Sequence, residues 1–149
     1  ELKTVVLSDC IEVLGEQTFY NCDALTEVRF GKNLKTISPR AFINCVSLTS
    51  ITIPDTVEKI GLRAFNSCTA LTDVTLGRGI TELPSYLFSC CYKLRRVNCL
   101  GVITSVGDFA FSDCPALEKI YVPAGCDWNA VAIGSDNDAL SHAEIVVEK

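Results

Sequence analysis

Apolar residues recur along this chain with a period of 23 residues. Six leucines each open a unit, and each is followed three positions later by Val or Ile; the leucines are Leu2, Leu25, Leu48, Leu71, Leu94 and Leu117. Counting each leucine as position 0, further apolar residues fill positions +5, +9 and +12 in nearly every unit. Because residue type and position repeat together over the chain, we expect each unit to form one coil of a repeat protein.

Within each unit, the pattern predicts one short strand followed by turns. Positions +2 to +5 alternate between polar and apolar residues, which is typical of a strand with one buried face. We expect six such strands, all parallel in one sheet, near residues 4–7, 27–30, 50–53, 73–76, 96–99 and 119–122. A glycine at +13, such as Gly61, indicates a turn where backbones approach closely or where φ is positive. The Ala-Phe segment that follows, such as Ala64-Phe65, is expected to form one helical turn.

These units predict an α/β solenoid, because no coil can bury its apolar residues without a neighbour. About six coils are expected over residues 1–124, continuous with a C-terminal cap over residues 125–149. In the cap, we expect Trp128 to cover the last coil, rather than to act as a platform for a sugar. Ile145 and Val147 are expected to form one more edge strand. Since the first unit begins at its strand, further repeats or domains are expected to precede it in the native chain.

One unit closely resembles a known repeat. Residues 48–68, LTSITIPDTVEKIGLRAFNSC, are similar to the 23-residue leucine-rich repeat of BspA-like surface proteins, whose pattern is LxxIxIPxxVxxIGxxAFxxC. The resemblance extends from residue 2 to about residue 124, and the fourth and fifth units depart from it at Pro84, Leu87, Cys90, Cys99 and Leu100. It implies a right-handed leucine-rich repeat coil, a secreted or cell-surface location, and binding of a protein or extracellular-matrix ligand. It implies no catalytic residue.

Composition and charge exclude several classes of protein. Apolar residues make up 48% of the chain and charged residues 21%, which excludes intrinsic disorder. The net charge of −5 argues against a general nucleic-acid binder and against a binder of anionic membranes. No run of apolar residues is long enough to cross a bilayer, so we expect no membrane insertion.

Nine cysteines are unusual for a chain of 149 residues, and five of them fall at position +20. A zinc site needs ligands that converge, which thiols in a line along a solenoid do not provide. Adjacent coils about 4.8 Å apart would place Cα atoms within disulfide range, although parallel side chains suit that bond poorly. We therefore interpret these residues as a structural ladder of buried free thiols, with disulfides as the alternative: Cys22, Cys45, Cys68, Cys91 and Cys114.

Catalytic and metal-binding motifs are absent from the sequence. Cys90 stands one residue before the ladder, at a position that is polar in other units, so we expect it to be the most reactive thiol. A nucleophilic thiol needs a base or a positive neighbour, and His142, the only histidine, is expected in the cap and far from Cys90. The acidic run at 136–138 lacks the Gly and Glu of a calcium loop. We predict no enzymatic activity, no metal and no cofactor.

The outward positions of the strands predict a binding surface. The middle strands present Ser and Thr, whereas the last two present basic and aromatic side chains, which are enriched in binding hot spots. The candidate binding face consists of Arg29, Arg95, Arg96, Asn98, Lys119 and Tyr121. The favoured hypothesis is a non-enzymatic protein-interaction or adhesion module that binds through this face. The alternatives are a structural spacer without its own ligand and, less favoured, a thiol-dependent enzyme that uses Cys90.

Overall fold

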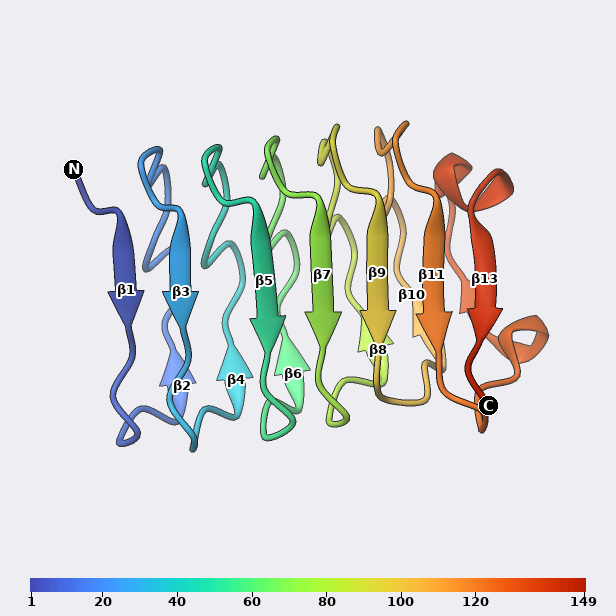
Figure 1. The fold of residues 1–149 in the computed structure, drawn as a ribbon, viewed down its shortest axis with the longest axis horizontal. Coiled ribbons are helices and arrows are strands. Elements are labelled where there is room, and N and C mark those ends of the chain that lie inside the picture. Colours follow the sequence, from blue (N-terminus) through green and yellow to red (C-terminus); the bar gives the residue numbers. More distant parts are fainter.

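The chain folds into a solenoid of stacked coils, in a computed structural model that describes all residues from 1 to 149 (Figure 1). One face carries the six expected strands, β1 (Thr4–Val6), β3 (Glu27–Arg29), β5 (Ser50–Ile53), β7 (Asp73–Leu76), β9 (Arg96–Cys99) and β11 (Lys119–Val122). Neighbouring strands other than β3 and β5 pair in parallel, and each paired residue lies beside the one 23 positions later, as Val74 lies beside Val97. The period in the sequence is therefore the length of one coil.

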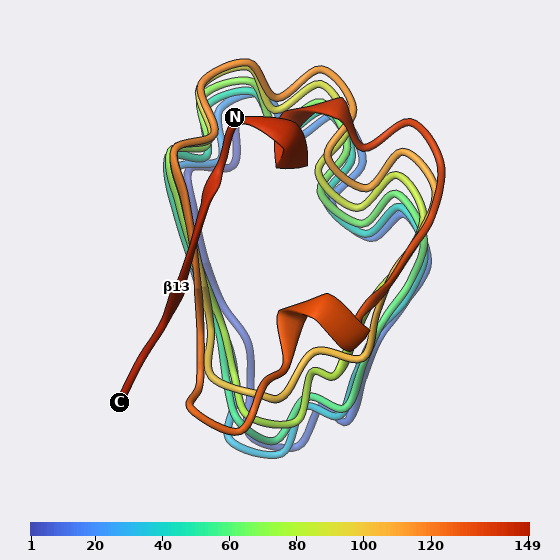
Figure 2. The same cartoon turned by 90° about the vertical axis from the view of Figure 1, so that its right-hand side faces the viewer.

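The expected single sheet is divided, and a second row of strands faces it across the core (Figure 2). On the first face, β1 and β3 form one sheet, and β5, β7, β9, β11 and β13 (Glu144–Val147) form another. The break coincides with Phe30, which packs edge-on against Phe42 at a centroid distance of 6.0 Å. The second row consists of β2 (Val13–Leu14), β4 (Thr36–Ile37), β6 (Lys59–Ile60), β8 (Glu82–Leu83), β10 (Ser105–Val106) and β12 (Ala132–Ile133).

The α/β assignment is wrong, because the chain contains no α-helix. Its only helices are two short 3₁₀ segments in the cap, η1 (Trp128–Ala130) and η2 (Asp138–Ser141). The Ala-Phe segments form turns because left-handed residues bracket them, as Arg40 (φ 59°) and Asn44 (φ 61°) do around Phe42. A positive φ cannot continue a right-handed helix. No glycine has positive φ; Gly61 instead permits close approach, since a Cβ there would collide with the backbone of Pro39.

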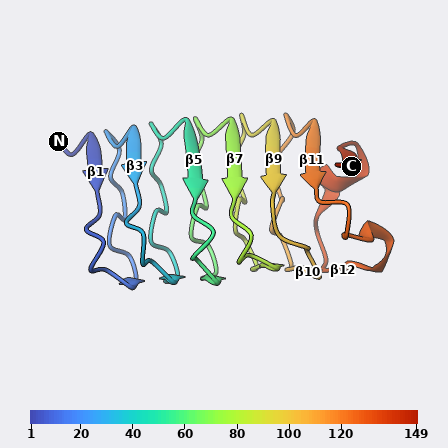
Figure 3. The ribbon, with the colours of Figure 1, turned by 60° about the horizontal axis from the view of Figure 1, so that its bottom comes forward.

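Each coil contributes one aromatic ring to a continuous core. Phe42, Phe65, Phe88 and Phe111 are fully buried, and the rings of Phe42 and Phe65 stack at a centroid distance of 5.1 Å. At the C-terminal end, half-buried Trp128 packs against this core. The edge strand expected from Ile145 and Val147 is β13, which pairs with β11 (Figure 1). Figure 3 shows the C-terminus at the β11 end of the stack, opposite the N-terminus. None of the helices is long and apolar enough to cross a membrane.

The second row is interrupted between β6 and β8, and Pro84 explains the interruption. In other coils, the residue at +13 donates its backbone N–H to the carbonyl at +12 of the preceding coil, as Gly61 does to Ile37 and Gly107 does to Leu83, both at 2.7 Å. Pro84 occupies this position and has no N–H to offer Ile60. Ser38 keeps the bond although it has a Cβ, so the missing donor, rather than side-chain bulk, distinguishes Pro84.

We expect Pro84→Gly to join the two halves of this row. The change supplies the N–H that Ile60 lacks and lets the bond from Glu82 to Glu58 form. Pro54→Gly is the matched control, because other coils already carry Gly31 and Gly77 at its position and it alters the unfolded chain similarly. Two hydrogen bonds at about 0.5–1.5 kcal/mol each should make Pro84→Gly more stable than the control by about 1–3 kcal/mol in urea unfolding. Equal stability of the two variants would contradict this explanation.

Candidate functional site

The outer face of the five-stranded sheet brings most of the predicted binding residues together. Arg96 is the first residue of β9 and Arg95 directly precedes it, and Lys119 and Tyr121 lie on the adjacent strand β11. Asn98 is paired in register with Tyr121. Arg29 does not join this group, because it lies on β3 in the other sheet, with β5 and β7 in between (Figure 1).

Each predicted cation of this group is paired with a carboxylate. Arg96 Nε lies 2.6 Å from Asp73 Oδ1, and Arg95 Nη2 lies 2.7 Å from Glu118 Oε1. Lys119 Nζ lies 3.2 Å from Glu144 Oε2. The surface is therefore a row of ion pairs, not the basic patch that the sequence suggested.

Two of these pairs also affect protonation. The hydroxyl of Thr72 donates to Asp73 at 2.7 Å, and this bond, with a further contribution from Arg96, holds the pKa of the Asp73 carboxyl below its usual range. The hydrogen bond to Glu144 raises the pKa of Lys119. Both shifts favour the charged forms of these two side chains.

A shallow pocket of about 300 Å³ lies beside these ion pairs. It is lined by Asp73, Val74, Thr75, Arg96, Asn98, Tyr121 and Glu148. The Oδ1 atom of Asn98 is buried and has no hydrogen-bond partner, and Tyr121 is half-buried. The pocket thus combines one aromatic ring, one amide and a set of charged side chains.

The sequence interpretation missed the acidic half of this site, which consists of Asp73, Glu118, Glu144 and Glu148. A signal for two of them was present, because Asp73 precedes Arg96 by 23 residues and Glu118 follows Arg95 by 23. Residues one period apart lie side by side in a solenoid, so opposite charges at that spacing predict an ion pair.

The cysteines at +20 occupy the interior of the coils. The thiols of Cys45, Cys68, Cys91 and Cys114 each donate to the backbone carbonyl of a phenylalanine in the preceding coil, at distances of 3.0 to 3.3 Å. Cys22 is only half-buried, since no coil lies on its outer side. All nine cysteines are free thiols. Each of these phenylalanine carbonyls also accepts the backbone N–H of the residue three positions later in its own turn, so the thiol is a second donor that links the turn to the next coil.

Burial makes these thiols poor nucleophiles. Desolvation raises the pKa of Cys45 to about 12 and that of Cys114 to about 12. It raises the pKa of Cys68 and of Cys91 well above the usual value in the same way. Because the thiolate is the reactive form, these residues are inert while the fold is intact.

Cys90 is half-buried rather than fully exposed, and its neighbours do not activate it. Its Sγ atom lies 3.8 Å from Asp113 Oδ2 and 3.7 Å from Ser89 Oγ. His142 is nearer than expected, since it lines a small cavity together with Asp113, but no hydrogen bond joins it to Cys90. No group of three or more His, Cys, Asp or Glu side chains is placed to hold a metal ion.

These features define a leucine-rich repeat solenoid with an open strand face. The repeat pattern described as "BspA type Leucine rich repeat region" matches residues 1–128 in six copies. The chain therefore belongs to the BspA-type leucine-rich repeat family, as the resemblance in the sequence predicted.

Solved structures of bacterial leucine-rich repeat proteins share the fold. A protein from Eubacterium ventriosum ATCC 27560 is 18% identical, with a TM-score of 0.80 over 92% of this chain and 42% of its own. A T. pallidum leucine-rich repeat protein is 26% identical, with a TM-score of 0.58 over 76% of this chain and 64% of its own. The chain thus spans less than two thirds of either protein. Among curated proteins, none matches it significantly.

Thiol labelling should follow burial. We expect exposed Cys10 to be alkylated first, Cys90 more slowly, and the buried ladder cysteines only after unfolding, because their thiolate is scarce and enclosed. Mass spectrometry of N-ethylmaleimide adducts over time, with and without denaturant, measures the order. Alkylation of Cys68 as fast as that of Cys10 in the folded protein would contradict the buried ladder.

Stability should depend on the charge of Asp73 at acidic pH. The pKa of Asp73 is lower in the folded state than in the unfolded state, where it is about 3.9. The ionised carboxyl therefore stabilises the fold fully above the unfolded pKa, and this stabilisation is lost as pH falls through the folded pKa. Asp73→Asn should therefore be less stable than wild type at pH 6, and the difference should shrink towards pH 2. Unfolding in urea at several pH values measures this. Asp136 makes no ion pair, so Asp136→Asn provides the control. If that variant loses as much stability at pH 6 and recovers it in the same way towards pH 2, the effect does not come from the charge of Asp73.

Proposed function

We propose that the chain is a non-enzymatic interaction module of a secreted or cell-surface protein, and that it binds a protein or extracellular-matrix ligand through its strand face. Membership of the BspA-type family supports the class of function. The gathering of Arg96, Asn98 and Tyr121 around one pocket on neighbouring strands supports the position of the site. This gathering is the observation on which the proposal mainly depends.

The physical properties of this face suit binding. Its strands are held by hydrogen bonds to both neighbours, so little backbone freedom is lost when a ligand binds. Tyr121 offers an aromatic anchor, and the side chains of Arg95 and Arg96 remain more than half exposed despite their ion pairs. Exposed ion pairs are weak, so these guanidinium groups can exchange a carboxylate of the chain for one of the ligand.

Two other functions have less support. A structural spacer would need no exposed pocket with an unpartnered amide, so the surroundings of Asn98 favour a ligand. A thiol enzyme would need a cation or an imidazole base beside Cys90, whereas the side chains that contact its thiol are a hydroxyl and a carboxylate, whose negative charge disfavours a thiolate. We therefore retain the spacer as the second candidate.

The test is binding to a panel of immobilised collagen, laminin and fibronectin, with Tyr121→Ala compared with Tyr20→Ala. Tyr20 is exposed and belongs to the first coil, on a turn outside the strand face, so it controls for the loss of a tyrosine. A hot-spot residue contributes at least about 2 kcal/mol, which corresponds to roughly 30-fold in affinity. We expect such a loss for Tyr121→Ala only. Wild-type protein that binds none of the panel, or variants that lose affinity equally, would favour the spacer.

A further inference from the structure

A column of cationic and aromatic side chains runs along the turns of the solenoid, outside the strand face. It is formed by position +15 of four successive coils, which is occupied by Arg40, Arg63, Tyr86 and Phe109. All four residues have a left-handed backbone with φ of 58° or 59°, and all four are half-buried. Because the same backbone conformation recurs in neighbouring coils, these side chains leave the turns in the same direction.

Three members of this column form a continuous stack. The rings of Tyr86 and Phe109 lie at an interplanar angle of 3° and a centroid distance of 4.8 Å. The guanidinium of Arg63 lies 4.6 Å from the centroid of the Tyr86 ring, in a cation–π contact. Arg63 and Phe109 belong to the coils on either side of Tyr86, so both faces of its ring are covered. The stack therefore presents ring edges and guanidinium N–H groups to a ligand.

Arg63 is the only one of the six arginines that has no carboxylate partner. Of its side-chain nitrogens, only Nε is both buried and without a hydrogen-bond partner, so the two terminal amino groups are open to a ligand. In the adjacent coil, Arg40 lies 3.5 Å from Glu16, whereas the other four arginines lie 2.6 to 2.8 Å from their partners. Two neighbouring guanidinium groups thus have one distant carboxylate between them.

The chemistry of this column suits a carboxylate on a largely uncharged chain. A guanidinium group binds a carboxylate through two parallel hydrogen bonds, and stacking on an aromatic ring holds its plane in place. The net charge of −5 repels a dense polyanion, so an isolated acidic group is favoured over a polysulfate or a nucleic acid. Leu62, an exposed apolar residue directly before Arg63, offers a contact for an aliphatic side chain beside that group.

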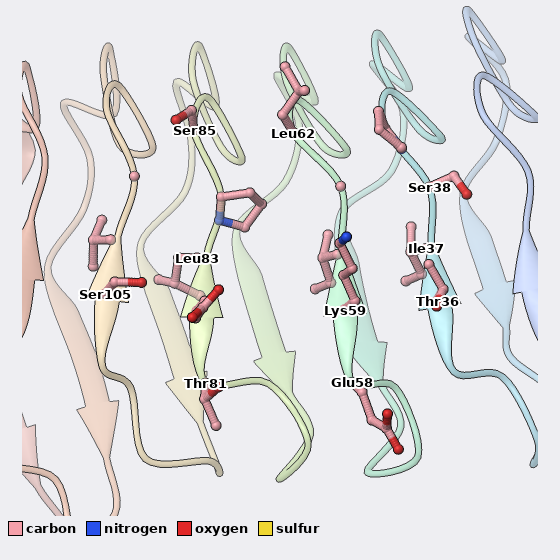
Figure 4. Close-up of a pocket in the computed structure, with 17 residues that line it drawn as sticks. Thr36, Ile37, Ser38, Glu58, Lys59, Leu62, Thr81, Leu83, Ser85 and Ser105 are labelled. Atoms are coloured by element: carbon pink, nitrogen blue, oxygen red, sulfur yellow. The ribbon is translucent and has the colours of Figure 1, made fainter.

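The column borders a shallow groove that can accommodate the rest of such a ligand. The groove has a volume of about 930 Å³ and extends across β4, β6, β8 and β10, which is in the range of ligand pockets. Its lining includes Pro39, Leu62 and Ser85, which directly precede the first three members of the column. Figure 4 shows Leu62 and Ser85 at the end of the groove where the strands lead into the turns. A bound segment can therefore lie on this surface while the coils beneath it stay stacked.

We propose that the column is a second binding site, which takes an acidic side chain of a partner polypeptide, and that the guanidinium of Arg63 holds its carboxylate. Arg40 adds a second positive charge to the site, and the ring edges of Tyr86 and Phe109 contact the aliphatic part of the segment. The column lies on the turns rather than on the outward side of β9 and β11. The site is therefore independent of the surface around Tyr121.

The probe is the peptide acetyl-SLELS-amide, compared with acetyl-SLQLS-amide, which has the same shape and no charge. Each peptide is titrated into the ¹⁵N-labelled chain and followed by NMR. We expect the largest shifts at the backbone amides of Leu62, Arg63 and Tyr86. The glutamine peptide should bind about tenfold more weakly, because a hydrogen bond between charged groups is replaced by a weaker one.

Arg63→Gln, compared with Arg78→Gln, tests the residue that holds the carboxylate. Glutamine suits the backbone at this position, because Gln17 occupies it in the first coil with φ of 56°. Arg78→Gln removes the same charge from an exposed ion pair in the turn after β7, so both variants have the same net charge. Binding of the glutamate peptide should weaken about tenfold in Arg63→Gln and stay unchanged in Arg78→Gln and in Tyr121→Ala.

Four results would overturn the proposal. The first is absence of shifts at the column with the glutamate peptide, and the second is equal affinity of the two peptides. The third is equal affinity of the Arg63→Gln and Arg78→Gln variants for the glutamate peptide; if Arg63→Gln then only lowers stability in urea, its cation–π contact has a structural role alone. The fourth is that sodium sulfate causes the same shifts at the same concentration, which would indicate a general anion site rather than one for a polypeptide.

Discussion

Stacking of one coil on the next is the interaction on which the whole structure depends. A coil of 23 residues has too little interior to bury its own apolar side chains, so each coil is completed by its neighbours. The same stacking satisfies the backbone, because strands, turns and cysteine thiols all form hydrogen bonds with an adjacent coil. Every position therefore meets its own equivalent 23 residues away, and the Phe and Cys columns are the direct result.

The first row of strands could be predicted from the sequence because its alternation is long enough to show a period of two. The second row could not, since two-residue strands such as Lys59–Ile60 show no period at all. The helical turn expected around Ala64-Phe65 was wrong for a different reason. Left-handed backbone is usually signalled by glycine, but here Arg63 and Ser67 adopt it, because stacking on the adjacent coils compensates for its local cost.

The outward residues of the candidate site could be grouped from the sequence, but the pairing of their charges could not. Arg96 and Lys119 stand out on an acidic chain as isolated cations, because their partners are distant in sequence. In the solenoid, those partners are immediate neighbours, and the cations become members of ion pairs. The charge that a surface presents thus depends on which side chains the fold brings together, even in a highly regular fold. A surface of paired charges favours selective recognition over general attraction, since a ligand must replace particular carboxylates to be bound.

Regularity also gives departures from the repeat a clear physical meaning. In an irregular protein, one proline changes many contacts at once, and its effect is hard to assign. In this solenoid, Pro84 removes one donor from a series of otherwise equivalent donors, so its effect is confined to the pairing of β6 with β8. The remaining sides of the coil hold the stack together, which is why the loss is tolerated. A solenoid can therefore acquire a new surface at a single coil without losing its fold, because stability is shared among many equivalent contacts and a site needs to interrupt only a few.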